Sequence, residues 1–392
     1  MTTSAYPRLV VSIPDEVAPA EAPELSERAL LWASTMDGQG VVLGGDQAGV
    51  RAAHELAPGL EAGVGLLDRE AREQLEDATL APGATRAAGA GRRRLAEAPD
   101  EWRTCFERDR DRILHSAAFR RLAGKTQVFV FPADHQRTRL THALEVAQVA
   151  AAIARACRLN VALAEAIALG HDCGHGPGGH ASEDALSPFV DGGFGHAVWG
   201  ADVTAASLNL CEETLDGIRN HSWSRPAPAT PEGEVVALAD RIAYTAHDLE
   251  DATHAGIVKA SFLPSLVTER CGATRSSQLR AFIGDVVRTT SRTGRVAMSE
   301  EMAAALAELR RFNYERIYLR PSSVEQSERV IEMLRALVEH FLRRPFEMPE
   351  EYASQPGRGA VAYVAGMTDR YACSQAVARL DWSSDRLPRG AA

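Results

Sequence analysis

Apolar residues recur with helical spacing over most of the chain after residue 107, and this pattern sets the fold class. They repeat at intervals of three or four, which places them on one face of an α-helix, whereas a half-buried strand would alternate them. We therefore predict a mainly α fold, with one small β-hairpin at 126–131. The predicted helices cover residues 107–123, 138–157, 160–170, 199–220, 233–254, 276–291, 298–310 and 324–343.

The first 80 residues follow a different pattern. Short apolar runs at Leu9–Ile13 and Val41–Leu43 alternate with helical patterns near 24–36 and 47–58, which predicts a small α/β accessory region. Residues 81–94, rich in glycine, alanine and arginine, have the composition of a linker. The expected regions are therefore an accessory region, a linker, a core and a helical extension that completes the core, at 1–80, 81–94, 95–260 and 261–392.

Three histidines and one aspartate lie between residues 171 and 180, in a glycine-rich loop between two helical stretches. Two more candidate ligands lie on the neighbouring stretches, His142 before the loop and Asp240 after it. With His171 and Asp172 they form a set of two imidazoles and two carboxylates, donors that divalent metal ions accept. No thiolate belongs to this set, which argues against a closed structural zinc site. We predict a divalent metal ion, and manganese, magnesium, iron, cobalt and nickel are all compatible.

A phosphate ester is the natural substrate of such a site. Four protein ligands leave coordination positions for water and for a phosphate oxygen, and a bound ion lowers the pKa of the water while neutralising phosphate charge. Arg139 lies three residues before His142 in the helical pattern, so both share one face. Its guanidinium can donate two parallel hydrogen bonds to phosphate. The sequence therefore predicts a phosphohydrolase.

The stretch from about Glu107 to Ile257 resembles the HD-domain deoxynucleoside triphosphate triphosphohydrolases, the dGTPase-like family. The similarity is long and ordered, and it continues more weakly toward the end of the chain. The motifs that carry it are Arg108–Leu122, Lys125–Val128, Arg137–Val146, the loop 168–180 and Ala239–Asp251, with weaker matches at Phe312–Tyr318 and Ala365–Tyr371.

This resemblance implies a specific reaction, in which water cleaves between the 5′ oxygen and the α-phosphorus and releases a deoxynucleoside and intact triphosphate. It also implies roles for single residues. The metal ligands match His142, His171, Asp172 and Asp240. The residues assigned to catalysis match His180 and Glu183, and the other active-site histidines match His175 and His196.

A polar stripe runs along one helical stretch, because Asp240, Tyr244 and Asp248 recur every four residues. By resemblance, Tyr244 packs on the sugar, where a ribose 2′-hydroxyl would collide with its ring, and Asp248 accepts the 3′-hydroxyl. Arg121 and Lys125 would suit a polyphosphate tail, and the family uses the position of Arg121 near the sugar. An acidic helix face and arginine stems that cover a helix are the simpler alternatives for these residues.

Glycines in the loop 174–179 permit close backbone approach and positive φ, so the loop can fold tightly and present His175 and His180. Glu183 lies three residues after His180, and we expect it to orient that imidazole if a helix begins there. Both a general-acid role and a nucleophilic role stay open for His180. The segment around His196 departs from the family, because relatives carry Glu-His-Asn where this chain has Gly-His-Ala. A preference for dGTP is therefore not inherited.

Composition limits the setting and the partners. No apolar run approaches the roughly 20 residues that cross a bilayer, and six cysteines without short paired spacing fit reduced thiols, so we predict a cytoplasmic protein without a membrane partner. The net charge of −10 disfavours nonspecific binding to nucleic acid. By resemblance, we expect a homo-oligomer such as a hexamer, with a dNTP or modified nucleotide as substrate and a nucleotide or single strand as a candidate regulator.

Two alternatives remain at this point. The same metal site could serve hydrolysis of a nucleoside monophosphate, a cyclic nucleotide or an alarmone. The chain could also be a weakly catalytic oligomer that senses nucleotides or binds single strands, as the altered segment around His196 and the extra N-terminal region suggest. Retention of all four candidate metal ligands argues against the second alternative.

Overall fold

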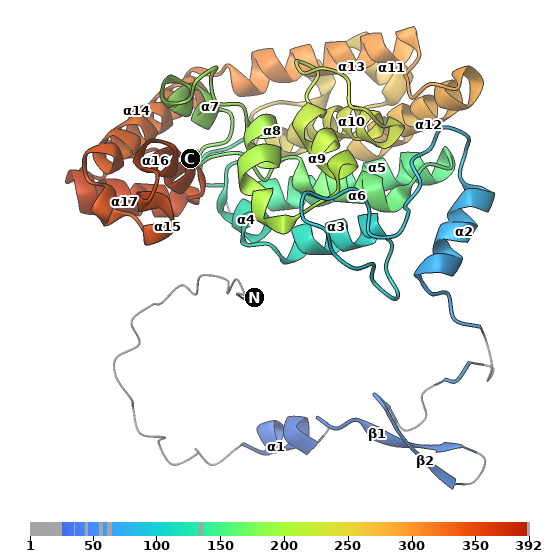
Figure 1. Ribbon diagram of the computed structural model, residues 1–392. Coiled ribbons are helices and arrows are strands. Elements are labelled where there is room, and N and C mark those ends of the chain that lie inside the picture. Colours follow the sequence, from blue (N-terminus) through green and yellow to red (C-terminus); the bar gives the residue numbers. More distant parts are fainter. Residues whose placement is uncertain are drawn as a thin grey trace, which may run out of the picture. The chain divides into compact units, whose positions relative to one another are not determined.

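The computed structural model describes residues 26–34, 36–43, 46–54, 58–60, 65–132 and 136–389. It divides into two units, Met1–Leu66 and Leu67–Ala392. The mainly α prediction is confirmed: the one sheet among these residues has two strands, and every other regular element is helical (Figure 1). No helix in these ranges is long and apolar enough to cross a membrane.

The first unit contains helix α1 (Glu27–Ser34) and the antiparallel strands β1 (Gln39–Leu43) and β2 (Asp46–Ala52). The expected strand at Val41–Leu43 lies inside β1, but the expected helix at 47–58 is wrong, because its first residues pair with β1 instead. The helical preference of such a short, weakly periodic segment is small, and the hydrogen bonds and side-chain contacts of a paired strand outweigh it. The expected run at Leu9–Ile13 lies outside the described residues.

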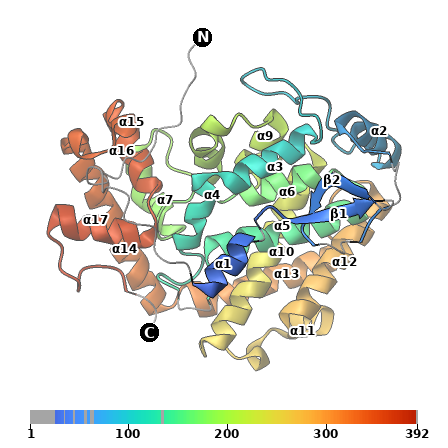
Figure 2. The ribbon, with the colours of Figure 1, turned by 90° about the horizontal axis from the view of Figure 1, so that it is seen from below.

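The second unit is a helical assembly with two hydrophobic cores. Helices α5, α6 and α10 pack on one another at the centre of the larger core, and α7, α14, α16 and α17 enclose the smaller one (Figures 1 and 2). Its α-helices are α2 (Arg69–Thr79), α3 (Cys105–His115), α4 (Ala117–Arg121), α5 (Arg139–Ala156), α6 (Val161–Gly170), α7 (Ala181–Leu186), α8 (His196–Trp199), α9 (Glu212–Asn220), α10 (Pro231–His254), α11 (Ser265–Cys271), α12 (Arg275–Thr293), α13 (Glu300–Asn313), α14 (Pro321–Arg343), α15 (Glu350–Ala353), α16 (Pro356–Ala365) and α17 (Asp369–Leu380).

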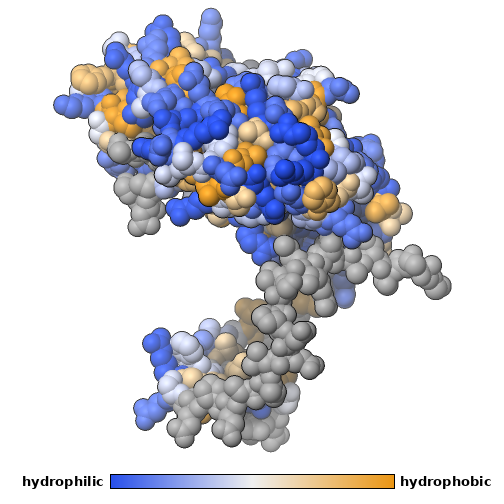
Figure 3. Space-filling view, turned by 90° about the vertical axis from the view of Figure 1, so that its left-hand side faces the viewer, coloured by the Kyte–Doolittle hydropathy of each residue, from blue (hydrophilic) through white to orange (hydrophobic). Residues whose placement is uncertain are grey.

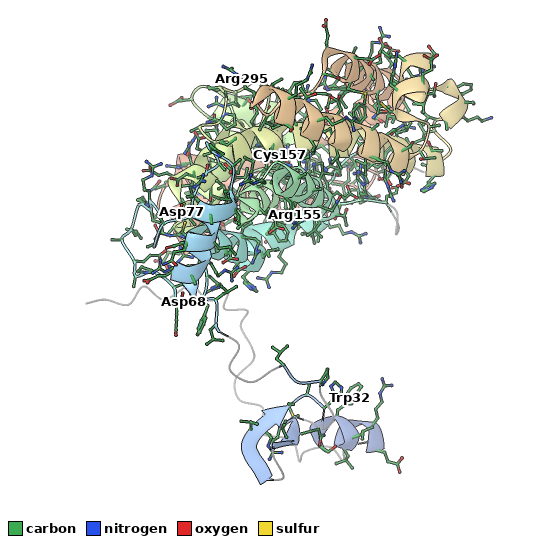
Figure 4. The ribbon with its side chains drawn as sticks, turned by 90° about the vertical axis from the view of Figure 1, so that its right-hand side faces the viewer. Trp32, Asp68, Asp77, Arg155, Cys157 and Arg295 are labelled. Atoms are coloured by element: carbon green, nitrogen blue, oxygen red, sulfur yellow. The ribbon has the colours of Figure 1, made fainter. Side chains whose placement is uncertain are left out.

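Helix α2 belongs to this second unit, although it lies within residues 1–80. The Asp68 side chain caps its start by accepting a hydrogen bond from the Ala71 N–H at 2.9 Å. At its other end, Arg158 Nε donates to the Thr79 carbonyl at 2.6 Å, just after the end of α5. Figure 4 labels Asp68 and Asp77 at α2, and Arg155 and Cys157 at the end of α5. The following segment 81–94 is packed as well, because Ala84 and Ala87 are buried.

Small residues let the central helices approach closely. Asn160 caps the start of helix α6 by accepting from the Leu163 N–H at 3.2 Å, and the last residue of the helix is Gly170. A Cβ on Gly170 would lie 2.5 Å from Ile218 Cδ1, so a larger residue at this position would force the buried Ile218 side chain of α9 to move. The residues that follow Gly170 are therefore held against α9.

Two expectations about local structure are wrong. Residues 126–131 form no hairpin, because the only ladder contact there is an isolated bridge between Thr126 and Thr138. The expected helix 199–220 is broken into α8, a π-helical turn at Gly200–Thr204 and α9. Asn209 adopts φ 49° before α9, a left-handed conformation that ends a helix. A second π-helical turn, Tyr314–Tyr318, continues α13, and its Leu319 N–H donates to the Tyr314 carbonyl at 3.0 Å.

Hydrophilic residues cover most of the face of the second unit in Figure 3, with apolar residues scattered among them. Such isolated apolar side chains are normal on a protein surface.

Candidate metal centre

The four predicted metal ligands meet where α5, α6 and α10 pack together. His142 lies on α5, His171 and Asp172 follow α6, and Asp240 lies on α10. The His142 Nε2 atom lies 3.1 Å from Asp240 Oδ1 and 3.8 Å from Asp172 Oδ2. The His171 Nε2 atom lies 3.7 Å from the same Asp240 oxygen and 3.5 Å from Asp172 Oδ1. The four side chains therefore converge from three helical regions, and His142, His171 and Asp240 each offer one atom within 4.8 Å of the others.

Their hydrogen bonds fit a metal ion. The Nδ1 atom of His171 lies 2.6 Å from the Ala168 carbonyl, which can only accept, so Nδ1 carries the proton and Nε2 keeps its lone pair. That Nε2 atom is buried and has no hydrogen-bond partner. A backbone partner that fixes the tautomer of a histidine is typical of metal ligands. Two imidazoles and two carboxylates can hold a divalent ion here.

Both carboxylates are ionised. Burial alone would raise the pKa of Asp172, but the charges of Arg139 and His171 outweigh it and hold that pKa well below its ordinary range. Burial also opposes ionisation of Asp240, and the hydrogen bond and charge of His142 with the charge of His171 keep its pKa low. The group of ligands is therefore ready to bind a cation.

Arg139 joins this centre from the first turn of α5. Its side chain is 1% exposed, and Nη1 donates to Asp172 Oδ2 at 2.6 Å. The Nε and Nη2 atoms of the same guanidinium are buried without hydrogen-bond partners. A Cβ on Gly179 would lie 2.6 Å from Nη2, so a glycine with φ +63° is needed beside it. Buried donors without acceptors are costly, and a phosphate oxygen would satisfy them.

A row of histidines continues from the metal ligands. The rings of His175 and His196 stack with their centroids 3.7 Å apart, and the ring of His180 lies 5.0 Å from that of His175. Burial, together with the positive charges of Arg139 and His196, lowers the pKa of His180 to about 4. Burial and Arg139 also lower the pKa of His175. These two imidazoles are uncharged at neutral pH.

Glu183 has a different partner from the expected one. Its Oε1 atom accepts from His196 Nδ1 at 2.8 Å and from the His196 backbone N–H at 2.9 Å, whereas within the described chain Glu183 meets His180 only through a backbone hydrogen bond. Burial would raise the pKa of Glu183, but the hydrogen bond and charge of His196 lower it to about 2. The first turn of α7 therefore directs this carboxylate toward α8, and His180 receives only its electrostatic influence.

His221, directly after α9, is an additional member of the cluster that the sequence did not indicate. Its Nε2 atom lies 3.2 Å from His196 Nε2, and its ring lies 4.9 Å from that of His171. Its Nδ1 atom donates to the Ile218 carbonyl at 2.8 Å. Burial and the two neighbouring histidines lower its pKa to about 3. With His171 and Asp172, it makes a second group of atoms close enough to hold an ion.

A cavity of about 700 Å³ opens over these residues. The stripe of Asp240, Tyr244 and Asp248 on α10 lines one side of it. The Tyr244 hydroxyl accepts from Arg310 Nε at 2.7 Å, and burial raises the pKa of this tyrosine to about 12. Arg241 lies with its guanidinium carbon 3.7 Å from the ring centroid of Trp223, which also lines the cavity. Arginines thus supply local positive charge in a protein that is acidic as a whole.

Asp248 is held by two neighbours. Arg137 forms an ion pair with it and with Asp251 and Glu145, and the Tyr318 hydroxyl donates to its other oxygen. Burial raises the pKa of Asp248, against the lowering effect of Arg137. The carboxylate is therefore fixed at the cavity wall.

The basic residues before α5 lie elsewhere. Neither Lys125 nor Arg121 lines the cavity, and Arg120 is exposed. Lys125 Nζ is buried and donates to the carbonyl of His175 and, at 3.0 Å, to that of Ala365. Burial, with the nearby charge of Arg121, lowers the pKa of Lys125 to about 7. Lys125 therefore supports the histidine loop from behind, in place of the contact with phosphate that we expected.

Comparisons with known proteins match both halves of this unit. Residues 139–245 match the HD domain, and residues 296–377 match the phosphohydrolase-associated domain. The chain is 42% identical over 316 residues to a deoxyguanosinetriphosphate triphosphohydrolase-like protein of Caldanaerobacter subterraneus subsp. tengcongensis, with 78% of this chain and 93% of the relative covered. A protein of the same name from Clostridium perfringens (strain SM101) is 44% identical over 306 residues, with 73% and 89% covered. A solved phosphohydrolase from Bacteroides thetaiotaomicron gives a TM-score of 0.43 at 18% identity, with 64% of this chain and 65% of that chain covered.

Proposed function

This chain belongs to the deoxyguanosinetriphosphate triphosphohydrolase-like family of HD-domain phosphohydrolases, and on that premise we propose that it hydrolyses a deoxynucleoside triphosphate to a deoxynucleoside and inorganic triphosphate. One observation carries the proposal. Two imidazole and two carboxylate ligands converge beside the buried guanidinium of Arg139, which has two donor atoms without acceptors. A metal-held water and a phosphate group fit these two features together.

The chemistry forms one bond and breaks another. A water oxygen bonds to the α-phosphorus, the bond from that phosphorus to the 5′ oxygen breaks, and the 5′ oxygen leaves with a proton as part of the deoxynucleoside. A divalent ion held by His142, His171, Asp172 and Asp240 would supply charge neutralisation and an acidified water. Arg139 would hold an α-phosphate oxygen through its unpaired donors.

His180 is the candidate for proton transfer. It lines the cavity, and its imidazole is uncharged at neutral pH. An uncharged imidazole can accept a proton from the attacking water and later return it to the 5′ oxygen. The charge of Glu183 favours the imidazolium that forms in between.

The sugar would lie against α10. Tyr244 offers a ring held by Arg310, and a 2′-hydroxyl pressed on that ring would favour deoxyribose over ribose. Asp248 offers a carboxylate that Arg137 and Tyr318 hold in place, and it can accept a hydrogen bond from a 3′-hydroxyl. Selectivity for deoxynucleotides would follow from Tyr244 alone, because ribose and deoxyribose both carry the 3′-hydroxyl that Asp248 would bind, and base preference follows from neither side chain.

Product analysis tests the proposal. Metal-reconstituted protein is incubated with each dNTP and each NTP in ¹⁸O-water, and products are separated by ion-exchange chromatography. We expect deoxynucleoside and triphosphate, with ¹⁸O in the triphosphate, and no turnover by a His142→Ala control. Formation of diphosphate or orthophosphate would contradict the proposed cleavage position, and equal turnover of ribonucleotides would contradict the role of Tyr244.

A further inference from the structure

The chain folds back after α17 and runs along α14. Asp381, with φ 53°, ends α17, and Trp382 packs into the smaller core at 7% exposure. Arg386 forms an ion pair with Glu332 of α14 and lies over the Trp382 ring, 3.7 Å from its centroid. These contacts hold the start of the C-terminal tail, residues 381–389, against the helix.

Further contacts give the tail its direction. Arg329 Nη1 donates to the carbonyls of Asp385 and Leu387, and the Arg389 N–H donates to Gln326 Oε1 at 2.6 Å. Tail residues of increasing number thus meet α14 residues of decreasing number. The tail therefore runs antiparallel to α14, toward the beginning of that helix.

The beginning of α14 borders the cavity. Ser322, Ser323, Gln326 and Ser327 line it, and so does Arg389 at the end of the tail. Within the described part of the chain, the Arg389 guanidinium pairs with no carboxylate. The tail thus brings one more arginine to the cavity, on a segment with anchors of its own.

This wall of the cavity has its own chemistry. Val128, Phe129 and Val130 supply apolar surface, and Arg320 lies 5.8 Å from the ring centroid of Phe129. The serines and the glutamine of α14 supply neutral hydrogen-bonding groups, whereas the cavity's carboxylates, Asp172 among them, lie on or beside other helices. The metal ligands and Arg139 already define the place of the phosphates. A flat, uncharged group that carries hydrogen-bond acceptors fits the remaining wall, because it can pack on apolar side chains and accept from a guanidinium.

We propose that the C-terminal tail forms one wall of the nucleotide cavity and that Arg389 contacts the nucleobase there. The inference rests on the proposed function, because it takes the occupant to be a nucleotide. Arg389 then contributes to the recognition of the base and is not part of the phosphate-binding machinery.

Product binding separates these two roles. We would measure the affinity of full-length wild type and an Arg389→Ala variant for each deoxynucleoside and for inorganic triphosphate by calorimetry. We expect the variant to bind its preferred deoxynucleoside about 3- to 10-fold more weakly, as for the loss of about one hydrogen bond. Triphosphate affinity should stay within about twofold, since Arg389 contacts the base and not the phosphates in this proposal. An Arg343→Ala control removes the same charge from an exposed position on α14 and should change neither affinity.

Each alternative outcome has one meaning. Weaker triphosphate binding with unchanged deoxynucleoside binding would overturn the nucleobase contact, and so would an Arg389→Ala variant equal to wild type in both affinities. The proposed function fails separately, if wild type forms no triphosphate from any dNTP. An Arg329→Ala variant, which loses both hydrogen bonds to the tail carbonyls, should also weaken deoxynucleoside binding, as Arg389→Ala does.

Discussion

Replacement of Lys125 by methionine should change how the stability of the protein depends on pH. Lys125 is buried and its pKa falls from 10.5 to about 7 in the folded chain. Between these two values the unfolded chain binds one proton more than the folded chain, so the free energy of unfolding rises with pH. Below about pH 6 the lysine is charged in both states and contributes no slope.

The size of the effect follows from the two pKa values. A full proton of difference corresponds to about 1.4 kcal/mol per pH unit. The folded-state pKa of about 7 lies at the lower end of the range from pH 7 to pH 9. Over this range the free energy of unfolding of the wild type should therefore rise by about 2 kcal/mol relative to that of Lys125→Met. The lost hydrogen bonds to the carbonyls of His175 and Ala365 add an offset that does not vary with pH.

Denaturant unfolding, followed by circular dichroism, measures this difference. The buffer contains a metal chelator, and the pH is varied in steps of half a unit. Lys259→Met is the matched control, because Lys259 is exposed and its variant should run parallel to wild type over the same range. A Lys125→Met curve that also runs parallel to wild type would refute the reasoning. A higher KM for the deoxynucleoside triphosphate as the main effect of Lys125→Met, measured by steady-state kinetics, would also refute it, since that would assign Lys125 to phosphate binding.

Three further outcomes are expected. A His142→Ala variant should lose at least about tenfold in metal affinity, and elemental analysis after dialysis that finds wild-type metal content would contradict the proposed ligand set. Glu183→Gln should lower kcat about 10- to 100-fold with little change in KM, because His196 loses its charged partner; steady-state kinetics would instead show an unchanged kcat if that contact is only structural. Gly174→Ala should lower the free energy of unfolding by about 2–4 kcal/mol, since its Cβ would lie 2.0 Å from the His196 carbonyl oxygen, whereas Gly195→Ala meets open space and should melt like wild type.

The mainly α fold and the meeting of the four predicted ligands were both accessible from the sequence. Long helical periodicity marks α5, α6 and α10 without help from tertiary contacts, and each helix carries or precedes its ligand at a motif. His142, His171 and Asp240 are far apart in sequence, but helices of this length have few ways to pack. Local pattern and global fold agree in this part of the chain.

The rest depended on tertiary geometry. His221 follows α9 without any spacing that relates it to the other histidines, so only the packing of α9 on α6 brings it to them. The partner of Glu183 is His196, the first residue of α8. The sequence predicted one helix over 199–220 instead of a separate α8, so this contact could not be foreseen. Lysine is a common phosphate ligand, so the sequence could not tell that role from a structural one. The fold shows that Lys125 is buried and that it donates to backbone carbonyls.

The π-helical turn at Tyr314–Tyr318 has a consequence for how this family can change by insertion and deletion. Such a turn holds one residue more than an α-helical turn. Deleting a single residue there would let the backbone close into an ordinary α-helical turn, with little change in the direction of the chain, because either kind of turn completes about one rotation. The narrower turn would shift Tyr318 relative to Asp248, and it would shift the residues that lead to the start of α14 at the cavity wall. We expect a one-residue gap at this place in a homologous chain to mark a reshaped pocket, even where every metal ligand is retained.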